Sequence, residues 1–256
     1  MILFIHKIIN FIKDKYNISI PMNFLKAEWR KLILANYIVD ETVLQKYIPH
    51  KTELDLWEGK CYISLVGFMF QNTKVLGLKI PMHVNFEEVN LRFYVRYKEN
   101  NIWKRGVVFI KELVPRPALS FVANTLYKEH YQTVPMNHQW LERDDKLEIE
   151  YNWKFEGLTQ EIKVTADSKL RDISANSEME FITEHYWGYT KISPTKTFEY
   201  EVTHPRWQAY EILEHNIKVD YGLCYGKDFE FMNALKPASI MLAEGSVITV
   251  KNKKRL

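Results

Sequence analysis

Apolar and polar residues alternate along the segment 85–97, NFEEVNLRFYVRY. Its odd positions from Val89 to Tyr97 are apolar, whereas its even positions carry the hydrogen-bonding groups of Glu88, Asn90, Arg92, Tyr94 and Arg96. A period of two is typical of a β-strand with two different faces. The polar face points either to bulk water or into an enclosed interior, and the pattern alone leaves both open.

Comparable strand patterns recur along most of the chain and are separated by turn residues. The predicted strands cover 53–57, 60–70, 103–114, 146–155, 159–166 and 197–204, with a final hairpin over 238–250. The predicted turns lie at Glu58–Gly59, Glu99–Asn101, Gly157 and Glu244–Gly245. The segment 60–70 is nearly all apolar, which is typical of a strand buried on both faces.

Short helices are expected between some of these strands. One spans 40–48, because Asp40 can cap its N-terminus and Pro49 ends it. Another is predicted over Pro117–Glu129, where apolar residues recur at helical intervals and proline suits the first turn. A third is plausible near 177–187.

Strand after strand with few helices predicts an α+β fold. We expect a large, mostly antiparallel sheet that is curled or closed into a barrel, with short peripheral helices. No repeat or Gly/Ser-rich linker interrupts the chain, so residues 22–256 are expected to form a single domain. The segment 206–225 fits both helix and strand.

The composition mainly argues against certain partners and certain kinds of site. The chain of 256 residues is 46% hydrophobic and 26% charged, with a formal net charge of +3, so nucleic acid is not an expected partner. The two cysteines, Cys61 and Cys224, have no CxxC spacing, which argues against a disulfide framework or a zinc site and fits a reducing cytoplasm.

Residues 1–21 are treated as a peripheral N-terminal extension. The segment has helical apolar spacing but is too short and too interrupted by polar residues to span a bilayer, and it lacks the features of a secretory signal. Stable membrane insertion is therefore not expected. A surface-lying amphipathic helix and an extension upstream of a start at Met22 both remain open.

Several segments, in this order, resemble the uncharacterised bacterial family DUF2071, the YqjF-like proteins. The resemblance runs from about Trp29 to Trp207, and its segments are WRKLILANYIVD, LQKYIPHKTELDLWEGKCYISLVGF, PMHVNFEEVNLRFYVRY, RGVVFIKELVPR, ANTLYKEHYQTVPM and VTHPRW. It implies a relationship to acetoacetate decarboxylase-like proteins, whose curved antiparallel sheets close over an internal pocket.

The resemblance also bears on chemistry. In the decarboxylases a lysine of a Pro-Lys-Lys run forms a Schiff base, but here His130, Tyr131 and Gln132 stand at the corresponding place. Lys128 lies three residues too early to substitute. Schiff-base chemistry is therefore not expected, and no cofactor is indicated.

The decarboxylase-like architecture favours an inward direction for the polar face of 85–97. We predict Glu88, Arg92 and Tyr131 as the working groups of a pocket, with further ligand contacts from Asn90, Tyr94, His130 and Glu184. The alternative for Glu88 and Arg92 is a buried ion pair that only holds the barrel. The histidines lack H-x-H or H-x-x-x-H spacing, so no metal site is expected.

Three functions remain open from the sequence. The first is a soluble cytoplasmic protein that binds a small, anionic or carbonyl-containing molecule in an internal barrel pocket. The second is an enzyme that performs proton transfer, hydration or decarboxylation with Glu88, Arg92 and Tyr131. The third is a structural or interaction module whose barrel is filled by its own side chains. The oligomeric state is not determined by the sequence.

Overall fold

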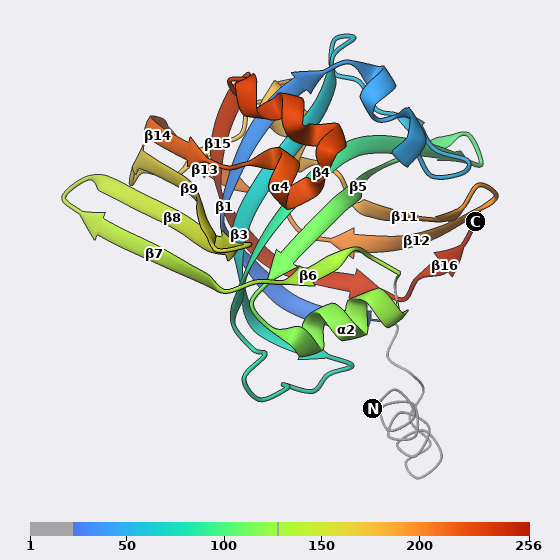
Figure 1. Ribbon diagram of the computed structural model, residues 1–256, viewed down its shortest axis with the longest axis horizontal. Helices are drawn as coiled ribbons and strands as arrows, with labels where there is room; N and C mark the ends of the chain where they lie inside the picture. Colours follow the sequence, from blue (N-terminus) through green and yellow to red (C-terminus); the bar gives the residue numbers. More distant parts are fainter. Residues whose placement is uncertain (1–22, 127) are drawn as a thin grey trace.

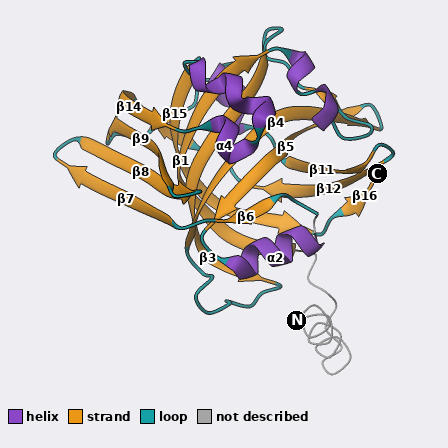
Figure 2. Cartoon of the chain, in the orientation of Figure 1, coloured by secondary structure: helices purple, strands orange, loops and turns teal. Residues whose placement is uncertain are grey.

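The computed structural model describes residues 23–126 and 128–256, so the expected peripheral extension at 1–21 lies outside the described residues. Strands dominate and the helices are few and short (Figure 2), which confirms the predicted α+β class. Within the described part of the chain, no helix is both long and apolar enough to cross a membrane.

Strands occur along the whole described part of the chain (Figure 1). They are β1 (Asn23–Val39), β2 (Glu53–Leu54), β3 (Cys61–Val75), β4 (Phe86–Glu99), β5 (Ile102–Val114), β6 (Tyr131–Thr133), β7 (Met136–Arg143), β8 (Lys146–Phe155), β9 (Leu158–Asp167), β10 (Arg171–Asp172), β11 (Trp187–Ser193), β12 (Lys196–Thr203), β13 (Gln208–Tyr210), β14 (Ile212–Lys218), β15 (Ser239–Lys251) and β16 (Lys254–Arg255). The α-helices are α2 (Pro117–Leu126), α3 (Glu178–Thr183) and α4 (Tyr221–Tyr225), and the 3-10 helices are η1 (Glu41–Val43), η2 (Gln45–Tyr47) and η3 (Lys227–Ala234).

The larger sheet closes on itself. Its strands follow the order β15-β1-β3-β4-β5-β11-β12, and β12 pairs again with β15 through Val202 with Val250 and Thr203 with Thr249. Most neighbours are antiparallel, while β11 and β6 each run parallel to β5. Closure leaves no open strand edge along this circuit, and it encloses an interior.

A second sheet of four strands, β14-β9-β8-β7, lies beside the barrel (Figure 1). It gives the barrel strands an apolar partner on their outer face. Val89, Leu91 and Phe93 of β4 belong to the same core cluster as Ile149 and Tyr151 of β8. Because side chains alternate along a strand, the even positions of β4 point the other way, into the barrel.

The segment around 40–48 is helical, but as two 3-10 turns rather than one α-helix. Asp40 caps it as predicted, since its carboxylate accepts the Thr42 backbone N–H at 2.8 Å. The turn at Glu58–Gly59 is also present. The strand before that turn, however, is only β2, and β2 pairs with β4 instead of forming a hairpin with β3.

The predicted hairpin over 238–250 is wrong, because β15 runs through it without turning. Gly245 has a φ of 81° and lies opposite Arg30 of β1. A Cβ at this position would lie 2.0 Å from the Trp29 carbonyl oxygen. The glycine therefore serves a close backbone approach within a strand, not a turn.

Several elements were not predicted. No strand is predicted from the sequence over 23–39, 136–143 or 187–193, where β1, β7 and β11 lie. The ambiguous stretch 206–225 contains both kinds of structure, namely β13, β14 and α4. Helix α2 begins at Pro117 as expected but ends at Leu126, before the predicted end at Glu129.

Candidate functional site

The barrel contains a cavity of about 160 Å³ that is partly open to its surroundings. Most of its wall is apolar and aromatic, including Trp29, Phe68, Phe70, Phe86 and Phe109, and helix α2 contributes Leu119 and Ala123. Its polar lining residues include Glu88, Asn90, Arg92, Glu112, Glu129, Tyr131, Thr183, His185 and His204. A dry protein cavity of about 150 Å³ accommodates benzene, so this one has room for a small organic molecule.

Strand register builds the polar side of the cavity. Asn90 of β4 faces Glu112 of β5, and Glu112 faces Tyr131 of β6. Facing side chains on neighbouring strands start about 5 Å apart, so these three form one polar row across the sheet. Glu88 and Arg92 lie two residues to either side of Asn90, about 6.6 Å along β4. Five polar side chains therefore converge on one region.

A β-bulge brings Glu112 to this row. Leu91 pairs with Lys111, but Arg92 pairs with Phe109, which leaves Ile110 as an extra residue in β5. Before the bulge the odd residue Phe109 lines the cavity, and after it the even residue Glu112 does. Simple alternation would have given these two residues opposite faces, and for this reason sequence reasoning missed Glu112.

Glu88 is buried and held at both oxygens. Its Oε1 accepts a hydrogen bond from Asn90 Nδ2 at 2.9 Å, and its Oε2 accepts one from the Tyr131 hydroxyl at 3.2 Å. Burial raises the pKa of Glu88 to about 7, although these hydrogen bonds and the nearby Arg92 charge act to lower it. The carboxyl can therefore gain or lose a proton near neutral pH.

Two other glutamates share this interior. Burial, reinforced by the charges of Glu129 and Glu88, raises the pKa of Glu112 well above its ordinary value. Burial also raises the pKa of Glu129 to about 7, although Glu129 Oε1 accepts hydrogen bonds from Thr190 Oγ1 and the Tyr200 hydroxyl. Three buried carboxyl groups that line one cavity disfavour one another's ionisation.

Arg92 is buried, with 7% of the residue exposed. Its Nε has no hydrogen-bond partner, and no ion pair joins the guanidinium to any residue that the structure describes. The Glu88–Arg92 ion pair considered from the sequence does not form, because both Glu88 oxygens are turned to Asn90 and Tyr131. The guanidinium instead lies 5.9 Å from the centre of the Tyr94 ring.

A second network, which we call the paired network, consists of the buried Asp55 and His185 and the half-buried Arg105. Asp55 Oδ2 accepts hydrogen bonds from Arg105 Nε at 2.6 Å and from His185 Nε2 at 3.2 Å. Burial alone would raise the pKa of Asp55, but the His185 and Arg105 interactions hold it below its ordinary value. The Asp55 carboxylate is therefore charged and compensated.

His185 joins this network to the cavity, which it lines. The centre of its ring lies 4.6 Å from that of Tyr94, with the planes tilted by 38°, and Arg92 approaches the same Tyr94 ring. Burial lowers the pKa of His185 to about 4, so the imidazole is neutral at neutral pH. Nε2 lies 3.2 Å from Asp55 Oδ2 and 3.4 Å from Arg105 Nη2. We assign the proton to Nε2, because the Asp55 carboxylate is the shorter contact, and in this tautomer the unpartnered Nδ1 is a hydrogen-bond acceptor.

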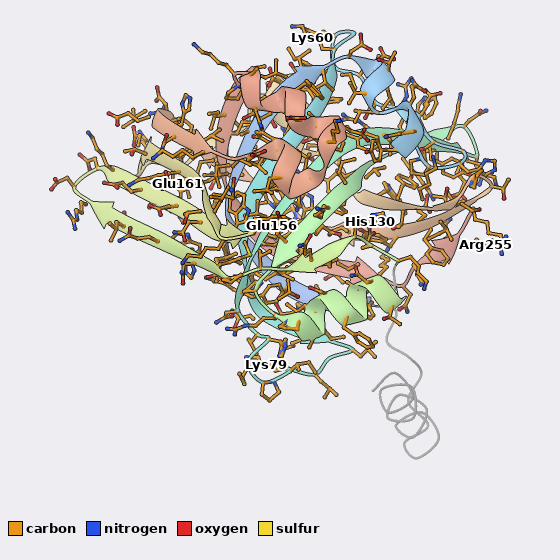
Figure 3. All side chains as sticks on the ribbon, in the orientation of Figure 1. Lys60, Lys79, His130, Glu156, Glu161 and Arg255 are labelled. Carbon is orange, nitrogen blue, oxygen red and sulfur yellow. The ribbon has the colours of Figure 1, made fainter. Side chains whose placement is uncertain are left out.

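Three residues expected to contact a ligand lie outside the cavity lining. Tyr94 points into the barrel but does not line the cavity, and its hydroxyl pairs with Ser64 Oγ at 2.7 Å. His130, labelled in Figure 3, is exposed and lines a separate hollow with Lys46 and Tyr47. Glu184 accepts a hydrogen bond from the Tyr186 hydroxyl instead.

The difference between His130 and Tyr131 has a simple cause. The two residues are adjacent at the start of β6, and adjacent residues of an extended chain point to opposite sides. Tyr131 therefore faces the cavity and His130 does not. The paired network was also missed, because 130 residues separate Asp55 from His185 and no spacing rule connects them.

The cavity offers little for metal or amine chemistry. Within residues 23–126 and 128–256, no group of three His, Cys, Asp or Glu side chains is placed to hold a metal ion. None of the described lining residues is a lysine, and Lys128 is exposed. A Schiff base would therefore lack its amine at this wall.

Comparisons with known proteins address the family and the fold. The model of DUF2071, described as an uncharacterised conserved protein, matches residues 26–247. The uncharacterised protein YqjF of Bacillus subtilis (strain 168) is 36% identical over 96 residues, which cover 36% of this chain and only 38% of YqjF.

Two solved structures are similar over almost the whole chain. The enduracididine biosynthesis enzyme MppR with HEPES buffer bound has a TM-score of 0.66 at 12% identity, covering 93% of this chain and 89% of its own. An acetoacetate decarboxylase-like enzyme from Sphingomonas wittichii RW1 has a TM-score of 0.62 at 12% identity, with 93% and 95% covered. Such low identity shows the fold alone. From the family match and this likeness together, the chain belongs to the DUF2071 family and has the acetoacetate decarboxylase-like fold.

Proposed function

We propose that this protein binds a small organic anion with an apolar body in the barrel cavity, and that Arg92 is the anion's partner. The observation that carries the proposal is the buried Arg92 guanidinium, which lacks a hydrogen-bond partner for its Nε and has no ion pair within the described residues. A buried, uncompensated charge costs several kcal/mol, and a carboxylate would supply both the charge and the hydrogen bonds.

The shape and lining of the cavity support a small apolar body. The volume of about 160 Å³ suits a molecule of benzene size or slightly larger, and aromatic side chains surround it. A protein of the same fold, MppR, has been solved in complex with pyruvate, a small carboxylate, at a TM-score of 0.63 and 11% identity. The proposal carries a ligand of this chemical class to the present chain.

Hexanoate is a suitable first probe, because it combines a carboxylate with a short apolar chain. Isothermal titration calorimetry would compare the wild type with Arg92→Met, which keeps the apolar stem and removes the charge. A charge-assisted hydrogen bond contributes about 1.5–3 kcal/mol, so the variant should bind at least about tenfold more weakly.

Arg96→Met is the matched control. Arg96 lies on the same strand, but it is paired with Glu53 near the surface. This variant should bind hexanoate as the wild type does. Equal binding by wild type and Arg92→Met would remove Arg92 from the site and overturn the proposal.

A second candidate function is acid–base catalysis on such a molecule. It is favoured by Glu88, whose pKa is raised to about 7 by burial and whose oxygens are positioned by Asn90 and Tyr131. Exchange of the C3 protons of 2-oxohexanoate in D₂O, followed by proton NMR, tests it. Catalysed exchange that Glu88→Gln abolishes would support an enzyme. Exchange at the uncatalysed rate with the wild-type protein would contradict catalysis and leave ligand binding as the proposed function.

A further inference from the structure

The cavity holds more hydrogen-bond acceptors than an anion can use. Asn90 Oδ1 and Glu112 Oε2 are both buried and have no hydrogen-bond partner among the described residues. These residues are 1% and 2% exposed, and both line the cavity. A carboxylate ligand brings only acceptors, so it would leave Asn90 Oδ1 unsatisfied and would bond to Glu112 only in its protonated form.

The charges of the cavity point the same way. Glu88, Glu112 and Glu129 all line it, whereas Arg92 is the single lining cation among the described residues. Asn90 and Glu112 face each other across β4 and β5, with Arg92 two residues further along β4. Acceptors that need a donor therefore stand beside a guanidinium that needs an anion.

We propose that the ligand is a zwitterion of the apolar amino-acid type, whose ammonium group donates to Glu112 and Asn90 while its carboxylate binds Arg92. This inference rests on the proposed function for its carboxylate half and adds the second half. An ammonium has three donors and no acceptor, which complements the two orphan acceptor atoms. The adjacent positions of these groups match the short separation of the two charges in an amino acid.

Binding by this mode has a defined proton balance. An ammonium beside the carboxyl groups favours their ionised form, so protons leave the protein when it binds at pH 7. A carboxylate without an ammonium has the opposite effect, because it adds negative charge beside the same groups and favours their protonated form. The sign of the proton exchange thus separates the two kinds of ligand.

Three probes with the same hydrocarbon chain make the test. Norleucine carries both charged groups, hexanoate lacks the ammonium, and pentylamine lacks the carboxylate. Calorimetric titration at pH 7 in phosphate and in Tris, which differ in ionisation enthalpy, gives the number of protons exchanged. We expect norleucine to bind at least about tenfold more tightly than hexanoate, with protons released, and hexanoate to bind with protons taken up.

Glu112→Gln separates the two halves of the site. It keeps the shape of the side chain but removes its charge, so it should weaken norleucine and pentylamine at least about tenfold and leave hexanoate unchanged or tighter. Glu142→Gln, on the exposed part of β7, is the control and should change none of the three.

The outcomes distinguish this inference from the proposed function. Norleucine that binds no more tightly than hexanoate, or that binds with proton uptake, overturns the zwitterion while leaving the anion site intact. Hexanoate binding that does not depend on Arg92 overturns the anion site itself. If Glu112→Gln does not fold, the relative affinities of the three probes for the wild type, and the number of protons exchanged with each, decide whether the ligand is a zwitterion.

Discussion

Two buried polar groups of residues flank the ring of Tyr94, and they differ in how far their charges are compensated. In the paired network, Asp55 is held by Arg105 and His185 at hydrogen-bond distance. On the cavity side, Arg92 has no such partner within the described residues, and Glu112 has an unpartnered oxygen. The paired network can be explained by stability alone, whereas the cavity side has groups that a ligand would satisfy.

Asp55→Asn should produce the largest effect on stability. It keeps the shape of the side chain but leaves Arg105 without its charged partner. Breaking a fully buried ion pair costs about 3–5 kcal/mol, and because the Arg105 side chain is 32% exposed we expect the lower end of this range. Urea denaturation would measure the loss, with the exposed Asp145→Asn as the control. Unchanged stability of Asp55→Asn would mean that the paired network does not hold the barrel.

Glu88→Gln should change how stability depends on pH. The Glu88 pKa is raised from 4.5 to about 7, so its stabilising contribution is complete below pH 4.5 and is lost as pH rises towards 7. One such group contributes about 1.4 kcal/mol per pH unit, or about 3 kcal/mol over this interval. Urea denaturation at pH 5, 6, 7 and 8 should therefore show a smaller decline for the variant. An identical pH profile would show that Glu88 ionises normally.

Arg92→Met should stabilise the ligand-free protein. It replaces a buried charge that lacks an ion pair within the described residues with an apolar side chain, and such replacements are neutral or stabilising by about 1–2 kcal/mol. The same urea experiment at pH 6 measures it. A loss of several kcal/mol would show that the guanidinium is a structural group like Arg105, and the contrast between the two regions would disappear.

His185 gives the smallest and most local prediction. Because burial lowers its pKa to about 4, the imidazole should stay neutral at pH 5, with the proton on Nε2 facing Asp55. Nitrogen-15 NMR distinguishes this tautomer from the charged ring. Asp55→Asn removes the carboxylate that fixes the tautomer, so the nitrogen shifts should change in that variant. A charged ring at pH 5 in the wild type would contradict the assignment.

The fold was predictable where one face of a strand differs from the other. The alternation in 85–97 and in 146–155 gave β4 and β8 directly. It failed at β1 and β15, because both strands contain a continuously apolar run, 32–35 and 240–243, and carry irregularities, such as Gly245, that imitate turns. Local pattern cannot separate a turn from a glycine that allows two backbones to approach closely.

The candidate site was accessible from the sequence only in part. Glu88, Asn90 and Arg92 share a face because they are two residues apart on one strand, and the cavity is on that face. Glu112 and the paired network depend on strand pairing between distant segments, which no local spacing encodes. His130 was predicted to contact the ligand but does not line the cavity, because adjacent residues of an extended chain point to opposite sides and Tyr131 points inward.

The extra residue Ile110 in β5 has a consequence for how such a chamber can diversify. Removing that single residue would restore strict alternation and still leave Glu112 opposite Asn90 and Lys111 opposite Leu91, because the pairs on either side of the bulge are unchanged. The acidic group at this wall would therefore stay in place. What a one-codon deletion would change is the local bend of β5, and with it the shape of the chamber.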